Sequence, residues 1–216
     1  MRHAVFTLLI TGCASGGPPS NAAADAAGDD DAPPGRGDAS RADAPERPDA
    51  PANACAFSGV LATWSFAGDA GSQASTPATS SAQGFTAGDV HRATTLTAVS
   101  GANSMNSSNW PSSASRDDTK YYTLTITPPS GCMLDITSAA IDAKSSGTGP
   151  TKASVATSAD SFGPGQTVST TAASTPSLTV TNQAAAVEIR IYGWTASGSA
   201  GTMRLQNTLT LTGSSH

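Results

Sequence analysis

The sequence contains few charged and few aromatic side chains. Charged residues make up 12% of the chain and aromatic residues 5%, and the three histidines and three cysteines form no paired zinc-ligand spacing. A nucleic-acid-binding protein needs clustered Lys and Arg to neutralise phosphates, whereas the basic residues here are scattered. We therefore expect no nucleic-acid partner. No apolar stretch approaches the roughly 20 residues that a membrane-spanning helix requires.

Patterns of catalytic residues are also scarce. A Ser-His-Asp arrangement would have to use His91, which lies near Asp89, and the chain has no Gly-x-Ser-x-Gly element to carry a nucleophile. A glycosidase needs two carboxylates that converge in a cleft, whereas the adjacent Asp117 and Asp118 would point apart on a strand. We expect a noncatalytic protein, with a hydrolase as the less favoured alternative.

The chain begins with a short basic and apolar segment that ends at a cysteine. Arg2 precedes an apolar-leaning run from Ala4 to Ile10, and the small residues Thr11-Gly12 come directly before Cys13. This arrangement resembles the signal of bacterial lipoproteins, which implies that residues 1–12 are a signal peptide and that Cys13 carries lipid. Several acyl chains, at about 0.8 kcal/mol per buried CH₂, would make a durable anchor.

The residues after the cysteine indicate to which membrane the protein is sorted and how the domain is connected to its anchor. Ala14 stands where an aspartate would retain the protein in the inner membrane, by resemblance to enterobacterial signals. We therefore expect an outer-membrane lipoprotein that faces either the periplasm or the cell surface. Residues 13–54 contain no aromatic and no branched aliphatic residue, and they carry eight acidic against three basic side chains. Such a composition cannot offset the entropy of ordering, so it predicts a disordered acidic tether.

From Cys55 to the carboxyl terminus, apolar residues alternate with polar ones in short runs. Residues 60–66 place Val60, Ala62, Trp64 and Phe66 on one predicted face and Leu61 on the other. Clusters of Ser, Thr, Gly and Pro separate this run from the next ones. The pattern predicts a single β-rich domain over residues 55–216, with no amphipathic helix.

Further strands follow the same period. Tyr121–Thr127 alternates apolar residues with threonine, and a Pro-Pro-Ser-Gly turn then leads into Met133–Ile136, which predicts a hairpin. Other half-buried strands are expected around residues 153–157, 178–180, 187–191 and 203–211. Short strands at such spacing predict an all-β fold, and we expect a two-sheet antiparallel β-sandwich.

Two cysteines remain if Cys13 carries lipid. Cys55 and Cys132 would then lie in an oxidising compartment, and we predict that they form a disulfide. Two free thiols are the alternative, and they follow if the two Cα atoms lie more than about 7 Å apart.

Four segments in the second half of the domain occur in a distinctive combination. They are Ser145–Pro150, Ser158–Phe162, Ile189–Trp194 and Gly201–Asn207. Together they resemble a β-sandwich module of secreted and surface-anchored bacterial proteins, including many with PEP-CTERM sorting tails. The module is similar to jelly rolls of the galactose-binding type. The resemblance implies a jelly-roll fold and an extracytoplasmic setting more than a particular function.

The candidate ligand-binding residues are aromatic and basic. Trp194, Tyr192 and Arg190 share a predicted strand face, and Trp110 lies in the polar loop 103–115. An exposed aromatic ring next to polar groups is the usual basis of sugar binding, because the ring stacks on the C–H face of the sugar. A structural role for the same residues, with Arg190 paired to a carboxylate, remains the alternative.

No cofactor or metal is expected. A calcium ion at the rim of the sandwich, held by Asp69, Asp117 or Asp118, stays open as an alternative. The sequence thus predicts a lipid-anchored, extracytoplasmic surface or binding module whose partner besides the membrane is a glycan or an envelope protein. A structural envelope component without a small ligand is the competing interpretation.

Overall fold

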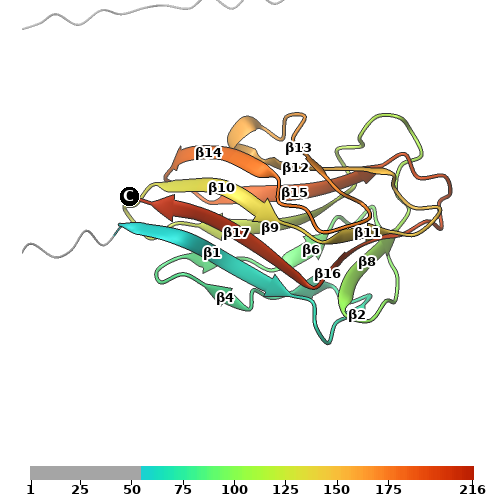
Figure 1. Cartoon of the computed structure of the whole chain (residues 1–216), viewed down its shortest axis with the longest axis horizontal. Coiled ribbons are helices and arrows are strands. Elements are labelled where there is room, and N and C mark those ends of the chain that lie inside the picture. Colours follow the sequence, from blue (N-terminus) through green and yellow to red (C-terminus); the bar gives the residue numbers. More distant parts are fainter. Residues whose placement is uncertain (1–54) are drawn as a thin grey trace, which may run out of the picture. The chain divides into compact units, whose positions relative to one another are not determined.

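A computed structural model describes residues 55–216, and nearly all of its regular structure is β-strand (Figure 1). The signal peptide (1–12), the lipidation at Cys13 and the tether (13–54) lie outside the described residues. The elements are β1 (Phe57–Ser65), β2 (Ala70–Gly71), β3 (Ser75–Thr76), β4 (Ser80–Ser81), β5 (Thr86–Ala87), β6 (Val90–Arg92), β7 (Thr97–Ala98), β8 (Ser104–Ser108), β9 (Tyr121–Thr127), β10 (Leu134–Ala140), β11 (Ala143–Ser145), β12 (Lys152–Thr157), the 3₁₀ turn η1 (Ser158–Asp160), β13 (Gln166–Val168), β14 (Ser177–Gln183), β15 (Val187–Trp194), β16 (Met203–Gln206) and β17 (Thr208–Ser215).

The strands form three hydrogen-bonded sheets. The front sheet has the order β14-β10-β17-β1-β4, and the back sheet has the order β13-β12-β15-β9-β6-β3, with β5 also paired to β9. A short sheet of order β11-β16-β8-β2, with β7 beside β8, continues from the strands of the front sheet (Figure 1). All pairings are antiparallel except the one between β2 and β8. The predicted all-β, antiparallel character is confirmed, and the arrangement is that of a β-sandwich.

The core lies between the layers, where alternate side chains of each strand meet. Tyr122, Leu124 and Ile126 of β9 are buried, as are Val187 and Ile189 of β15, in agreement with the period-two prediction. Trp64 of β1 is fully buried as well, and its indole N–H donates to the Gly88 carbonyl at 2.9 Å. A buried donor needs such a partner, and the bond fixes the orientation of the ring in the core.

The predicted face of β1 is wrong at one position. The register with β17 shifts between Val60 and Ala62, which is the signature of a β-bulge at Leu61. The extra residue turns Leu61 into the core and leaves Val60 49% exposed, whereas Ala62 and Trp64 face inward as predicted. A bulge cannot be recognised from alternation alone, because both Val60 and Leu61 are apolar.

The predicted hairpin is also wrong. Tyr121–Thr127 is β9 of the back sheet, but the next strand, β10, pairs with β17 and β14 in the front sheet. The Pro-Pro-Ser-Gly segment therefore carries the chain from one layer to the other. Its prolines lack the N–H groups that a tight hairpin ladder would use.

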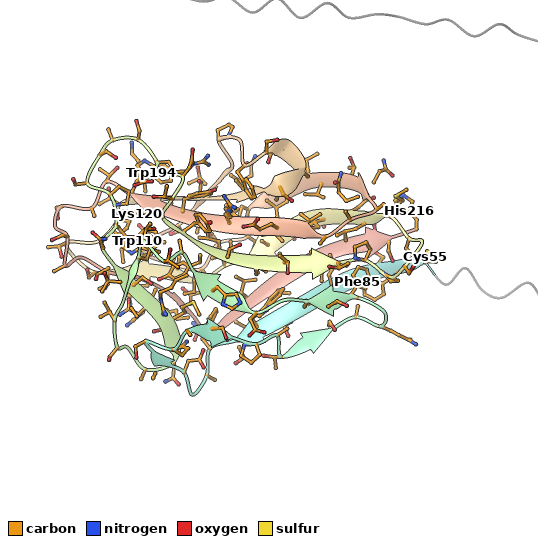
Figure 2. The ribbon with its side chains drawn as sticks, turned by 180° about the vertical axis from the view of Figure 1, so that it is seen from behind. Cys55, Phe85, Trp110, Lys120, Trp194 and His216 are labelled. Atoms are coloured by element: carbon orange, nitrogen blue, oxygen red, sulfur yellow. A yellow bond between two sulfur atoms is a disulfide. The ribbon has the colours of Figure 1, made fainter. Side chains whose placement is uncertain are left out.

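The predicted disulfide is confirmed. Cys55 and Cys132 are bonded, with their Cα atoms 5.3 Å apart and 77 positions apart in the chain. The bond links the residues just before β1 with the segment that crosses between the layers. The Ser215 hydroxyl donates to the Cys55 carbonyl at 2.6 Å. Cys55 and His216 lie together at one end of the sandwich, which we call the entry end (Figure 2). The opposite end is called the distal end.

Among residues 55–216, no helix has the length and apolar character needed to cross a bilayer.

Candidate functional site

The outer face of the back sheet carries a group of aromatic and basic side chains that contact one another. Alternation along β15 buries Val187, Ile189 and Ile191 and turns Arg190 and Tyr192 to the other face. In the antiparallel ladder with β9, Tyr192 lies opposite Tyr121. Cross-strand neighbours of this kind have side chains close enough to contact. The sequence therefore places a row of rings and guanidinium groups along one surface.

Arg190 is packed between two aromatic rings. Its guanidinium carbon lies 4.2 Å from the Tyr121 ring centre and 3.9 Å from that of Phe162. Its Nε donates to Glu188 at 2.7 Å, and the Thr123 hydroxyl donates to the same carboxylate oxygen at 2.8 Å. Burial alone would lower the pKa of Arg190, but its hydrogen bonding and charge interaction with Glu188 raise it. Arg190 is therefore a fixed cation that holds the two rings in place.

Arg116 covers the neighbouring ring and connects two loops. Its guanidinium carbon lies 4.2 Å from the Tyr192 ring centre. Its Nη1 and Nη2 donate to the carbonyls of Gly163 and Phe162 at 2.7 and 2.6 Å, and its Nε donates to Asp118 at 2.7 Å. Arg116 thereby ties the loop before β9 to the loop between η1 and β13. We call Arg116, Tyr121, Phe162, Arg190 and Tyr192 the outer-face cluster.

Tyr192 is fully buried beneath this cover. Its ring meets the Tyr121 ring edge to face, with centres 5.7 Å apart. Burial raises the pKa of Tyr192, and the nearby Arg190 guanidinium opposes this rise. The Arg190 side chain also hydrogen-bonds the Tyr192 hydroxyl. The buried Ser154 hydroxyl, across the ladder on β12, has no hydrogen-bond partner, which is unusual in a native fold.

A hydroxyl-rich hollow of about 450 Å³ adjoins the cluster. We call it the threonine hollow; its lining residues are Arg92, Ala93, Thr94, Thr95, Asp118, Thr119, Tyr121 and Thr123. Tyr121 belongs both to this hollow and to the outer-face cluster, and the Asp118 side chain is 73% exposed. The Arg92 guanidinium is engaged elsewhere, since it donates to the carbonyls of Gly71 and Gln73. The hollow thus offers one aromatic wall, several hydroxyls and one accessible carboxylate.

The predicted ligand residues do not form one site. Trp194 is half-buried at the distal end and lies opposite Lys152 in the ladder with β12 (Figure 2). Trp110 is only 3% exposed, its N–H donates to the Ser107 carbonyl, and its ring packs on Tyr122. Trp110 is a core residue, and its buried ring offers no exposed face on which a sugar could stack. A polar loop sequence did not reveal that its one large side chain turns inward.

The three carboxylates considered for calcium each have their own hydrogen-bond partners. Asp69 accepts hydrogen bonds from Gln73 and Thr76, at 2.8 and 2.5 Å. Asp117 accepts both the N–H and the hydroxyl of Thr119, which hold its pKa below the ordinary value, and Asp118 pairs with Arg116. The described part of the chain has no group of three His, Cys, Asp or Glu side chains placed to hold a metal ion.

His91 and Asp89, the residues considered for a hydrolase, have the following neighbours. His91 is exposed on β6, where it lies opposite Ser75 on one side and Thr123 on the other. The Asp89 carboxylate accepts a hydrogen bond from the Ser75 hydroxyl at 3.0 Å.

Three contributors to the surface were missed from the sequence: Tyr121, Phe162 and Arg116. In the Tyr121-Tyr122 pair, strand alternation requires one ring to face outward, and this signal was available. Phe162 and Arg116 lie in loops, whose positions no periodicity predicts. Comparisons of this chain with protein-family models, with curated proteins and with solved structures each found no match.

Proposed function

We propose that this chain is a noncatalytic carbohydrate-binding module, displayed from an outer membrane by lipid on Cys13 and by the tether of residues 13–54. The observation that carries the proposal is the threonine hollow, in which Tyr121 stands beside several threonine hydroxyls and the exposed Asp118 carboxylate. The described domain is proposed to be a jelly roll of the galactose-binding type. Its two antiparallel layers support this finer assignment.

The chemistry of the hollow suits a sugar ring better than a charged ligand. An aromatic ring stacks on the C–H face of a pyranose, while hydroxyls and a carboxylate bond its equatorial hydroxyl groups. The hollow has no free cluster of basic groups, because Arg92 is bound to backbone carbonyls and Arg116 is bound to Asp118 and the flanking loop. A phosphate or sulfate group would therefore find no counter-charge there.

The position of the entry end supports display from a membrane. The described domain begins at Cys55, which lies at the end of the sandwich opposite Trp194 (Figure 2). A tether that joins there leaves the distal end, with Trp194 and the loop that carries Arg116, turned away from the attachment point. Trp194 is proposed as a second aromatic contact for a longer glycan, since it lies on the same outer face as Tyr121.

A glycan array followed by calorimetric titration tests the proposal. We expect Tyr121→Ala to weaken the dissociation constant roughly tenfold, because one lost stacking contact is worth about 1.5 kcal/mol. Lys144→Ala, on β11 of the short sheet, serves as the matched control and should bind like wild type. If the chain binds no glycan, the proposal fails and the structural envelope component becomes the better interpretation.

Two further measurements test the remaining parts. Metabolic labelling with palmitate should tag the wild-type chain and leave Cys13→Ser unlabelled; an unlabelled wild-type chain would remove the proposed anchor. Incubation with the bound glycan should release no cleavage product. Product that disappears in His91→Ala would instead establish the hydrolase alternative.

A further inference from the structure

The loop after η1 crosses the outer face of the back sheet. We call residues 161–165, which lie between η1 and β13, the flap. Phe162 is its one large side chain, and this ring covers the Arg190 guanidinium at 3.9 Å. The root of the flap is fixed, since the Phe162 N–H donates to the Thr157 carbonyl at 2.8 Å. Beyond Phe162, the Gly163 carbonyl accepts a hydrogen bond from Arg116, and Gly165 packs against the Val155 backbone of β12.

The flap backbone is held in a conformation that its residues disfavour. Ser161 and Phe162 both have a φ of 56°, in the left-handed region that few residues other than glycine adopt. Two consecutive residues of this kind persist only when surrounding contacts hold them. Gly163 follows directly, and Gly165, after Pro164, has a φ of 71° and packs so closely on the Val155 backbone that a Cβ would lie 2.4 Å from its carbonyl oxygen.

Arg116 supplies the contacts that hold the flap closed. Its two terminal nitrogens donate to the carbonyls of Phe162 and Gly163, and both bonds come from a loop that is distant in sequence. Asp118 fixes the same guanidinium from the other side, through Nε. Because Asp118 also lines the threonine hollow, a ligand that bonds this carboxylate competes with the Arg116 contact.

The groups beneath the flap indicate that something else binds there. The Ser154 hydroxyl is buried, with the residue only 3% exposed, and it has no hydrogen-bond partner. Its ladder neighbour Tyr192 is bonded through its hydroxyl to the Arg190 side chain, so Ser154 is the unpartnered group of this pair. Buried hydroxyls are nearly always bonded in native proteins, so the Ser154 hydroxyl is matched to a polar partner that enters from the outer face. A sugar hydroxyl offers it both a donor and an acceptor.

We infer that the flap is a lid over a second sugar subsite, formed by Ser154, Tyr192 and Arg190. The inference rests on the proposed carbohydrate function and extends it, since Tyr121 lies between the threonine hollow and this covered subsite. The ligand class is a neutral glycan of at least two rings, one in the hollow and the next under the lid. Binding of the first ring to Asp118 releases Arg116, and the flap with Phe162 then swings off the subsite.

Tyrosine nitration tests the lid without any ligand. The chain has three tyrosines, and they form an internal set of controls: Tyr121 is half-buried, whereas Tyr122 and Tyr192 are fully buried. With tetranitromethane and mass spectrometry, we expect wild-type chain to be nitrated at Tyr121 alone. Arg116→Ala should raise the nitration rate of Tyr192 roughly tenfold, because local opening controls access to a buried group, and should leave Tyr122 protected.

Two variants complete the test. Phe162→Gly removes the ring that covers Arg190 and accepts the left-handed φ, so it should loosen the flap and with it the Arg116 cover of Tyr192. Lys152→Ala on the adjacent strand should leave Tyr192 protected. Unchanged Tyr192 nitration in both Arg116→Ala and Phe162→Gly overturns the lid. Joint exposure of Tyr122 and Tyr192 also overturns it, because the variants then loosen the whole core.

Nitration in the presence of a bound glycan distinguishes this inference from the proposed function. If the array yields a glycan, that glycan should protect Tyr121 in wild type and both Tyr121 and Tyr192 in Arg116→Ala. Protection of Tyr121 without Tyr192 contradicts the covered subsite and leaves the proposed function intact. If no glycan binds, the second-subsite assignment fails together with the proposed function, and the ligand-free nitration rates still decide whether residues 161–165 open.

Discussion

The Cys55–Cys132 disulfide should contribute several kcal/mol to the stability of the described domain. The bond closes a loop over 77 positions, which includes β1 through β9. The chain-entropy model assigns such a loop about 4 to 5 kcal/mol of free energy of unfolding at 25 °C. For a domain of this size, that corresponds to a fall in Tm of about 10 to 15 °C. The magnitude is large because the loop-closure entropy grows with the number of residues enclosed, and 77 positions separate the two cysteines.

The assay is urea unfolding of wild type and of the Cys55→Ala/Cys132→Ala double variant, each with and without reductant. We expect the free energy of unfolding of reduced wild type to approach that of the double variant. We expect the reductant to leave the free energy of unfolding of the double variant unchanged. A loss below about 1 kcal/mol would refute the reasoning, because the reduced unfolded chain would then keep the structure that the cross-link enforces. A reductant effect on the double variant would show that the assay measures something other than this bond.

Three smaller predictions follow from the packing. Trp110→Ala should lower the free energy of unfolding by about 3 to 5 kcal/mol in chemical denaturation, as expected for a buried indole, whereas Trp194→Ala should cost less than about 1 kcal/mol; equal losses would contradict the burial difference. Gly213→Ala should destabilise by about 1 to 3 kcal/mol, since the new methyl group would lie 2.0 Å from a backbone oxygen of β10, and a wild-type Tm would contradict this. Thr119 holds the pKa of Asp117 below its ordinary value, so the carboxylate stabilises the fold above pH 4 and loses this effect as the pH falls through its lowered pKa; Asp117→Asn should flatten acid unfolding by a few tenths of a kcal/mol, and an unchanged pH profile would show no such contribution.

The all-β character and much of the core followed from alternation. Tyr122, Leu124 and Ile126 are apolar at every second position, and each is buried. The disulfide followed from the pairing of Cys55 with Cys132, the two cysteines of the described domain. Alternation failed where the chain departs from a regular strand. The bulge at Leu61 reverses the face of Val60, and both residues are apolar, so the pattern has no signal for it.

The candidate site was less predictable than the core. Period two placed Arg190 and Tyr192 on an outer face, yet it gave no information on what covers them. Phe162 and Arg116 arrive from two loops, and their contacts depend on tertiary geometry. The burial of Trp110 could not be predicted for a related reason, since a tryptophan in a polar loop can turn either way. Loop positions depend on the strands they join, and these were known only once the layers were placed.

The most direct test of the account is the affinity of the purified chain for the glycan that the array selects. The account predicts measurable binding, weakened roughly tenfold by Tyr121→Ala and unaffected by Lys144→Ala. Absence of any bound glycan, or equal dissociation constants for wild type and Tyr121→Ala, would contradict the claim that the outer face of the back sheet recognises carbohydrate.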